Sequence, residues 1–407
     1  MPLSSASASA CARSSRVATQ SPARMWPVAW MITAVFMLSN SPTPLYVHWQ
    51  ERLGFSSGML TVIFALYIVG LLGTLLVAGQ LSDHYGRRPV LLPGLLAALV
   101  ACGLFASANS IAMLAVGRLL AGVSVGVIVS AGMAAVVDAA GPERKPKAAL
   151  LASIAMVLGA GLGPLFAGGA AQWLAHPVPP IFAVEALILF SALGVASRLP
   201  ARRKASSPLR LRLPYVPVSN RRHILSGIAT FGPGITATSF VLALGPSLLA
   251  RLLEIRSPLL AGGMACAMFF TAVGVQFAVQ KWPVARVFAA SALATILSMM
   301  CLVLAIHASL VPALIASALL AGAGQGLGQL GGLTLIGLHV PDTHRAQANA
   351  VLNIGGYIPA GLLPVATGYL IDRVGLASAG TSFALVLAVT ALVGGAWAMR
   401  RAEQHDA

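Results

Sequence analysis

Charged side chains are scarce in this chain. Asp, Glu, Lys and Arg make up 9% of its 407 residues, whereas a soluble globular domain carries roughly 25%. Only ten residues are acidic, and hydrophobic residues make up 58% of the chain. Because a surface in water needs more charge than this, most of the surface is expected to face something else. The shortage of charge therefore predicts an integral membrane protein.

The same shortage excludes several kinds of site. The acidic residues are scattered, without an Asp-Asp-x-x-Asp cluster or a His-Glu-x-x-His motif, and the cysteines have no metal-ligand or paired spacing: Cys11, Cys102, Cys266 and Cys301. A membrane-embedded enzyme, such as a lipid or prenyl transferase, would need paired acids or a nucleophile with a base, so it is a remote alternative. We predict no enzyme, no catalytic residue, no metal and no cofactor.

The net charge of +16 raises the question of nucleic acid. The basic residues form short clusters between long apolar runs, which is typical of membrane loops. They form no basic helix face and no patch interleaved with aromatic residues. We therefore predict no nucleic-acid partner. The expected partners are a small-molecule substrate and membrane lipids, and the expected state is a monomer.

Twelve apolar stretches are long enough to cross a membrane, which takes about 20 residues per helix. They cover residues 25–47, 58–80, 89–108, 111–139, 147–172, 180–198, 223–249, 258–280, 284–306, 309–339, 346–371 and 377–399. If both termini are cytoplasmic, the inner segments hold 21 Lys and Arg residues and the outer loops hold four. Since cytoplasmic loops are rich in these residues, this orientation is predicted. Arg outnumbers Lys by 22 to 4, a bias typical of GC-rich genomes, so we expect a bacterial inner membrane.

Polar segments divide the chain into parts. Residues 1–24 are rich in Ser and Ala and contain Arg but no acid, which is typical of an organellar transit peptide. A disordered cytoplasmic tail is the favoured interpretation, and an over-long start is a further one. Residues 199–222 are basic and proline-containing and are predicted to be a cytoplasmic linker on the inner leaflet. The predicted domains are two bundles, 25–198 and 223–399, with a cytoplasmic tail at 400–407.

An internal repeat relates the two bundles at an offset close to 200 residues. In the fourth and tenth spans, Leu119-Leu120-Ala121-Gly122 matches Leu319-Leu320-Ala321-Gly322, and Gly126 and Gly132 match Gly326 and Gly332. In the fifth and eleventh spans, Gly161-Leu162-Gly163-Pro164 and Gly168 match Gly361-Leu362-Leu363-Pro364 and Gly368. In the first and seventh spans, Pro44 falls near the position that matches Pro246. A repeated six-span unit keeps its orientation, as in transporters that bind their substrate between two halves. The predicted fold class is an all-α membrane protein with twelve transmembrane helices in two six-helix bundles related by a parallel repeat.

The loop after the second span carries the most specific motif. Its sequence, Gly79-Gln-Leu81-Ser-Asp83-His-Tyr-Gly86-Arg87-Arg88, resembles the signature loop of the major facilitator superfamily at every defining position. Two weaker motifs resemble patterns of this superfamily's fourth helix and of the fifth helix of its drug/proton antiporters: Leu114-x3-Arg118-x-x-Ala121-Gly122 and Gly159-x3-Gly163-Pro164-x-x-Ala167-Gly168. The corresponding loop of the second half has lost the acid and the glycines.

The resemblance implies a conformational latch on the cytoplasmic side, formed by Gly79, Asp83, Gly86, Arg87, Arg88 and Asp138. It implies that Asp83 faces the start of the eleventh helix, near residues 343–347, and that Arg87 pairs with Asp138. The alternative is a positively charged loop that needs Gly86 for its turn.

Arg118 is the one basic residue inside a span, roughly 10 Å deep at 1.5 Å per residue. An arginine there costs at least about 2.5–3.5 kcal/mol, so it is expected to face a cavity or a partner. We predict a substrate or proton-relay contact; the alternative is a structural arginine satisfied by backbone carbonyls or Asn40. The other predicted substrate contacts are polar side chains of four spans: Asn40, Thr43, Tyr46, Thr236, Ser239, Gln325, Gln329, Asn353 and Tyr357. Each of these is alternatively an interhelical hydrogen bond.

Two further features concern the fifth and sixth spans. A helix-break motif is predicted at Gly159, Gly163, Pro164 and Gly168, as a flexing point or a tight contact between the halves; a plain kink with close packing is the alternative. Glu185 is predicted to be interfacial, near the outer end of a peripheral helix.

These observations predict a secondary active transporter with alternating access, most similar to drug/proton antiporters. The expected activity is proton-coupled efflux of a small amphiphilic or drug-like solute, with the proton gradient as energy source. A cavity with a fixed positive charge favours neutral, amphiphilic or anionic solutes over strongly cationic ones. An importer or facilitator of a metabolite, and a sensor or receptor, are the alternatives.

Overall fold

The computed structural model describes residues 25–200, 214, 216–251 and 254–406. Over these residues the chain is helical and contains no strand, as the apolar stretches predicted. The tail at 1–24 and most of the linker at 199–222 lie outside the described residues.

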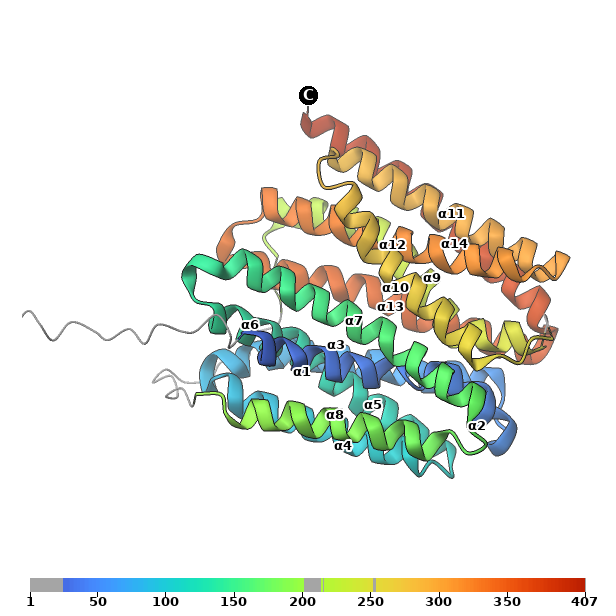
Figure 1. Cartoon of the computed structure of the whole chain (residues 1–407). Coiled ribbons are helices and arrows are strands. Elements are labelled where there is room, and N and C mark those ends of the chain that lie inside the picture. The colour runs from blue at the N-terminus through green and yellow to red at the C-terminus, as the bar shows by residue number, and fades with distance from the viewer. Residues whose placement is uncertain (1–24, 201–213, 215, 252–253, 407) are drawn as a thin grey trace, which may run out of the picture.

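The first half contains the shorter and more interrupted helices. Its elements are α1 (Met25–Asn40), η3 (Thr43–Leu45), α2 (Tyr46–Leu53), α3 (Ser57–Tyr85), α4 (Arg87–Ala106), α5 (Ile111–Val127), η4 (Ile128–Gly132), α6 (Met133–Ala140), η5 (Pro142–Arg144), α7 (Lys145–Trp173) and α8 (Val178–Ser197). The second half consists of η6 (Val218–Asn220), α9 (Arg221–Arg251), α10 (Pro258–Ala278), α11 (Val284–Ala308), α12 (Val311–His339), α13 (Asp342–Val374) and α14 (Leu376–Asp406). In Figure 1 the blue-to-green half lies below the yellow-to-red half.

Eleven helices of the described chain are long and apolar enough to cross a membrane, with α5, η4 and α6 forming one of them. The remaining predicted span, 25–47, which is the first along the chain, is not one helix. Pro42 and Pro44 lack the N–H groups that would continue the hydrogen-bond ladder of α1, so this helix ends at Asn40 and the chain resumes as η3 and α2. The first span is therefore a broken helix.

Glycines set the packing inside each half, and they do so twice in the same way. A side chain on Gly122 of α5 would collide with the Tyr67 carbonyl of α3, and one on Gly322 of α12 would collide with the Met268 carbonyl of α10. These two glycines are partners in the sequence repeat. Small residues allow membrane helices to approach closely, so the repeat preserves a helix–helix contact in each half.

Candidate functional site

Arg118 is buried in α5, with 1% of its surface exposed. Its Nε donates a hydrogen bond to the Tyr46 hydroxyl, and its Nη1 donates to the Ser39 carbonyl oxygen at 2.6 Å. Its Nη2 is buried and has no hydrogen-bond partner among the described residues. The guanidinium therefore retains hydrogen-bonding capacity.

The break in the first span provides both of these partners. Ser39 lies in the last turn of α1, where carbonyl groups lack intrahelical partners and carry the negative end of the helix dipole. Tyr46 begins α2, directly after the break. A positive charge is stabilised at such a helix end, so α1 holds Arg118 with its backbone. The alternative interpretation of Arg118, a structural arginine bound by backbone carbonyls, agrees with this contact to the Ser39 carbonyl. Asn40, the other partner of that interpretation, instead donates to Ser39 Oγ and to the Phe36 carbonyl.

Three aromatic rings surround the guanidinium. Its carbon lies 5.1 Å from the Tyr46 ring centre, 5.3 Å from that of Phe64 and 5.7 Å from that of Tyr67. These distances are within the range of cation–π attraction. The rings stabilise a buried cation without neutralising it, so the positive charge of Arg118 is retained.

The second half reaches the same place through α13. This helix packs against α3, which carries Phe64 and Tyr67, and the ring of its Tyr357 packs edge-on against Phe231 of α9, with ring centres 6.3 Å apart. One turn away on α13, Asn353 donates to the Asn349 carbonyl at 2.8 Å. Arg118, Tyr46, Phe64, Tyr67 and Tyr357 thus form a cluster between the halves, called here the arginine–aromatic cluster.

The other predicted contact residues are buried or half-buried elsewhere along the spans. Thr236 donates to the Gly232 carbonyl of its own helix at 2.7 Å, while Thr43 Oγ1 and Gln325 Oε1 are buried without a partner among the described residues. Ser239 is buried in α9, and Gln329 is half-buried in α12. Among the described residues, no hydrogen bond or ion pair joins any of these five side chains to Arg118.

Phe64 and Tyr67 were not among the predicted contact residues. They are three residues apart on α3 and therefore share a face of that helix. Aromatic residues at helical spacing usually pack in the core, so this pattern alone does not distinguish a binding wall from a packed interior.

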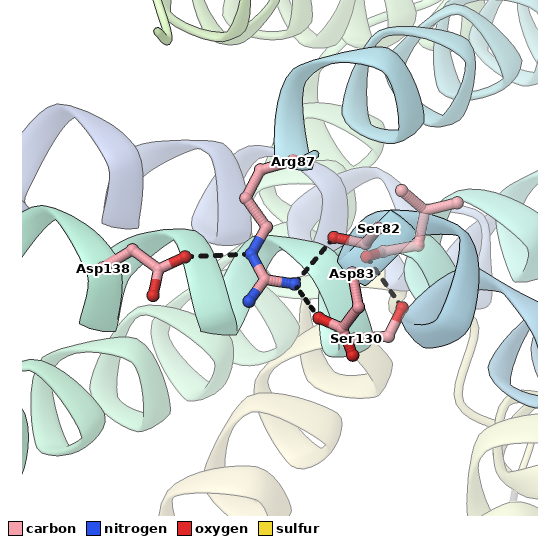
Figure 2. Close-up of polar contacts among 6 residues, drawn as sticks. Ser82, Asp83, Arg87, Ser130 and Asp138 are labelled. Atoms are coloured by element: carbon pink, nitrogen blue, oxygen red, sulfur yellow. Dashed lines mark hydrogen bonds and ion pairs between the residues drawn. The ribbon is translucent and has the colours of Figure 1, made fainter. Parts of the chain in front are cut away.

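The motif loop forms an ion-pair cluster, which Figure 2 shows. Arg87 Nε donates to Asp138 Oδ2 at 2.9 Å, and its Nη1 donates to Asp83 Oδ1 at 2.9 Å and to Ser82 Oγ at 2.8 Å. Gly86 ends α3 with φ at +94°, a conformation that side chains rarely adopt, and this turn brings Arg87 back toward α3. Gly79 faces open space, and Arg88 is half-buried beside Arg87. The ion pair between Arg87 and Asp138 that the family resemblance implied is present.

Asp83 forms its ion pair with Arg87, and 75% of its side chain is exposed. The side chains of residues 342 and 343, at the start of α13, lie outside the described part of the structure. The contact of Asp83 with residues 343–347 that the resemblance implied therefore stays a prediction.

The halves are joined at the opposite, predicted outer end. Asp372 of α13 accepts hydrogen bonds from the Ser57 and Gly58 N–H groups of α3, both at 2.9 Å. The free N–H groups at a helix start favour a carboxylate. Arg256 adds an exposed ion pair to Glu51 at 3.4 Å. We call the contact of Asp372 with the start of α3 the outer clasp.

The predicted helix-break motif does not break its helix, because α7 runs without interruption from Lys145 to Trp173. Its glycines mediate close packing instead. Side chains on Gly159 and Gly163 would collide with carbonyls of α1, and one on Gly168 would collide with the Pro258 carbonyl of α10. Pro164 in turn presents its carbonyl to Gly262 of α10. The motif therefore forms tight contacts within the first half and between the halves.

Glu185 is fully buried, with 0% exposure, so the prediction of an interfacial residue is wrong. Its Oε1 lies 2.5 Å from Ser41 Oγ, in the break of the first span. Hydropathy gives the depth of a residue along a helix but not the face on which it lies, and this face of α8 packs against α1.

Comparison with known proteins gives the family. The model of the Major Facilitator Superfamily matches residues 28–282 and 257–407. The tetracycline resistance protein, class H, of Pasteurella multocida is 32% identical over 163 residues, which are 36% of this chain and 39% of that protein. Multidrug efflux protein YfmO of Bacillus subtilis is 26% identical over 44% of each chain. The alignments with these curated relatives span less than half of their length.

Solved structures share the fold over nearly the whole chain. The nucleoside transporter NupG matches with a TM-score of 0.68 at 11% identity, covering 93% of this chain and 99% of that one. A bacterial homologue of the human lysosomal transporter Spinster, in an inward-facing conformation, matches with a TM-score of 0.69 at 13% identity, covering 94% and 96%. Because the family model covers both halves of the chain, this protein belongs to the Major Facilitator Superfamily.

Proposed function

We propose that this protein exports a small neutral, amphiphilic or anionic solute in exchange for protons. The observation that carries the proposal is Arg118, a buried cation with an unpaired Nη2 between the two halves. Its family and structural neighbours are transporters, which favours transport over an enzymatic activity.

The chemistry of the arginine–aromatic cluster supports this solute class. A buried positive charge repels cations, and the free Nη2 can donate a hydrogen bond to a carbonyl, phenolate or carboxylate oxygen. The rings of Tyr46, Phe64 and Tyr67 offer flat apolar surfaces for an amphiphile. No ion pair neutralises Arg118 among the described residues.

The two ends of the molecule support alternating access. The outer clasp joins α3 to α13, while Asp83 at the other end is exposed and turned toward Arg87. In the proposed cycle, the state with a closed outer clasp is the inward-open one, in which solute would reach Arg118 from the cytoplasm. Docking of Asp83 on α13 and opening of the outer clasp would give the outward-open state.

Export as the direction is supported by the relatives whose names describe multidrug efflux and tetracycline resistance. The proposed location is a bacterial inner membrane, with both termini cytoplasmic and the protein acting as a monomer. Import or facilitated diffusion of a metabolite uses the same site and is distinguished by the direction and proton dependence of transport.

The test is solute transport by proteoliposomes with an imposed proton gradient. Tetracycline and chloramphenicol serve as amphiphilic probes and methyl viologen as a permanent dication. Wild type is expected to move the first two with counterflow of protons and to leave the dication behind. Arg118→Ala is expected to abolish transport, whereas Arg286→Ala, which removes an exposed arginine, is expected to retain it.

A strong preference for the dication would contradict the proposed solute class. Solute movement without proton flux would make the protein a facilitator. Transport by Arg118→Ala at the wild-type rate would show that the cluster is not the site.

A further inference from the structure

Glu185 is a buried carboxyl group that the solute site does not use. It lies roughly 10 Å from the start of α8 at 1.5 Å per residue. Its Oε1 contacts Ser41 Oγ, and its Oε2 is buried without a partner among the described residues. One carboxylate oxygen with one hydrogen bond is poor compensation for the loss of water.

The surroundings of Glu185 provide no balancing positive charge. One turn earlier on α8, the Phe182 ring stacks on Trp49 and packs against Phe105, with ring centres 6.2 and 5.5 Å away. From α4, the titratable group that faces Glu185 is the Cys102 thiol. α7 carries its charged side chains, Lys145 and Lys147, at its other end, and α1 contains no charged residue.

Arg118 lies on the other side of the break and is bound there to the Ser39 carbonyl and Tyr46. No ion pair with Glu185 is present in the described part of the chain. An isolated buried carboxylate is strongly unfavourable, so in this conformation Glu185 is held in its uncharged form.

The hydrogen bonds of Ser41 also indicate that Glu185 is protonated, because the hydroxyl has too few protons for both of its contacts. Ser41 Oγ lies 2.5 Å from Glu185 Oε1 and 2.9 Å from the Met37 carbonyl oxygen. A hydroxyl has one proton to donate but can accept two hydrogen bonds. Both contacts are full hydrogen bonds only if Ser41 donates to Met37 and a protonated Glu185 donates to Ser41.

We propose that Glu185 is the proton-binding site that couples solute transport to the proton gradient, acting through Ser41 on the break in the first span. This inference rests on the proposed function. A proton taken up from the outer side converts the carboxylate to the carboxyl form, and its release to the cytoplasmic side restores the carboxylate. No other bond forms or breaks.

The consequence of proton release follows from the geometry. A carboxylate cannot donate, so the Ser41 proton turns from Met37 to Glu185. The Met37 carbonyl then keeps only the bond from the Ser41 N–H, at 3.1 Å. The same carbonyl is packed against Gly163 of α7, and two residues further along α1 the Ser39 carbonyl holds Arg118. Protonation of Glu185 and the position of Arg118 are therefore linked through residues 37–41, the last turn of α1 and the first residue of the break.

Two polar side-chain atoms in the segment after the break make no hydrogen bond among the described residues. Thr43 Oγ1 and Trp49 Nε1 are buried without partners among the described residues. They can form new hydrogen bonds when the break rearranges, which lowers the cost of moving this segment.

The first experiment needs no solute. Infrared difference spectra of the purified protein between alkaline and acidic pH are expected to contain the C=O band of a buried carboxyl group. The band should be present in wild type and in Glu143→Gln, which removes an exposed acid, and lost in Glu185→Gln. Persistence of the band in Glu185→Gln would overturn the proposal.

The second experiment measures coupling with tetracycline as the probe. Glu185→Gln is expected to retain downhill tetracycline exchange but to lose tetracycline-driven proton flux and uphill accumulation. Unchanged proton flux in this variant would overturn the role of Glu185 while leaving the proposed function intact. If wild type itself moves no protons while the infrared band titrates, then the coupled-transport proposal fails and the coupling role falls with it.

If Glu185→Gln does not fold, the variant Ser41→Ala still tests the relay. This variant is expected to keep the infrared band, because the carboxyl group remains, and to lose proton flux driven by tetracycline, because the connection to Met37 is gone. Normal coupling in Ser41→Ala would overturn the relay through Ser41.

Discussion

At the scale of single residues, the bond between Arg118 and the Tyr46 hydroxyl links α5 to the segment after the break. A hydrogen bond to a charged group contributes about 1.5–3 kcal/mol. Tyr46→Phe removes the acceptor and leaves the guanidinium Nε unpaired in a buried site. We expect a lower thermal midpoint, measured by size exclusion after heating in detergent, together with slower transport.

The control is Tyr369→Phe, which removes the hydroxyl of an exposed tyrosine. It is expected to behave as wild type. Equal behaviour of the two variants would show that the Tyr46 hydroxyl does not stabilise Arg118.

At the scale of helices, the repeated glycine contacts hold two helices of each half close together. A Cβ atom on Gly322 would collide with the backbone of α10, which cannot move aside as a flexible side chain can. Overpacking of this kind costs about 1–3 kcal/mol. Gly322→Ala is therefore expected to lower the thermal midpoint of the protein.

Gly274→Ala provides the matched control, because this helical glycine has nothing within 4 Å of the added atom. Alanine in a helix interior is favoured over glycine by about 0.5–1 kcal/mol, so this variant should be as stable as wild type or more so. A stable Gly322→Ala protein would show that α12 and α10 can separate at little cost.

At the scale of the whole molecule, the outer clasp and the motif loop lie at opposite ends of α3. Asp372→Ala removes both acceptors at the start of α3 and should shift the population toward the outward-open state. A carboxylate at a helix N-terminus is worth about 0.3–2 kcal/mol, so the ratio of the two states changes up to roughly thirtyfold. Spin-label distances between the outer ends of α3 and α13 measure this shift.

Asp83→Asn acts at the other end. It is expected to keep the outer-end distances of wild type, because the outer clasp is intact, and to slow the return to the outward-open state, in which Asp83 is proposed to dock on α13. Outer-end distances that stay unchanged in Asp372→Ala would show that the clasp does not hold the outside closed.

Much of the architecture could be predicted because hydropathy and loop charge act locally along the chain. The spans, the repeat and the pair between Arg87 and Asp138 followed from such patterns or from the family motif. The burial of Glu185 depends on which face of α8 meets α1, and a single helix does not specify this. Whether Asp83 meets α13 depends on how the two halves pack against each other, which a single loop motif does not specify. Pro42 and Pro44 could be seen in the sequence. That the chain after them brings Tyr46 to Arg118 could not be predicted, because it depends on how α2 packs against α5.

The outer clasp has a consequence for how this gate evolves. Asp372 binds main-chain N–H groups, which every residue except proline supplies. A substitution of Asp372 therefore needs no matching change of the side chain at position 57. Position 58 favours glycine for a steric reason, since a Cβ atom there would lie 2.7 Å from the Tyr369 ring and 2.8 Å from Asp372 Oδ2 and would require these two side chains to shift. Correlated substitutions between α3 and α13 would therefore miss this contact. Random mutagenesis for altered gating should yield changes at Asp372 without compensating side chains at position 57.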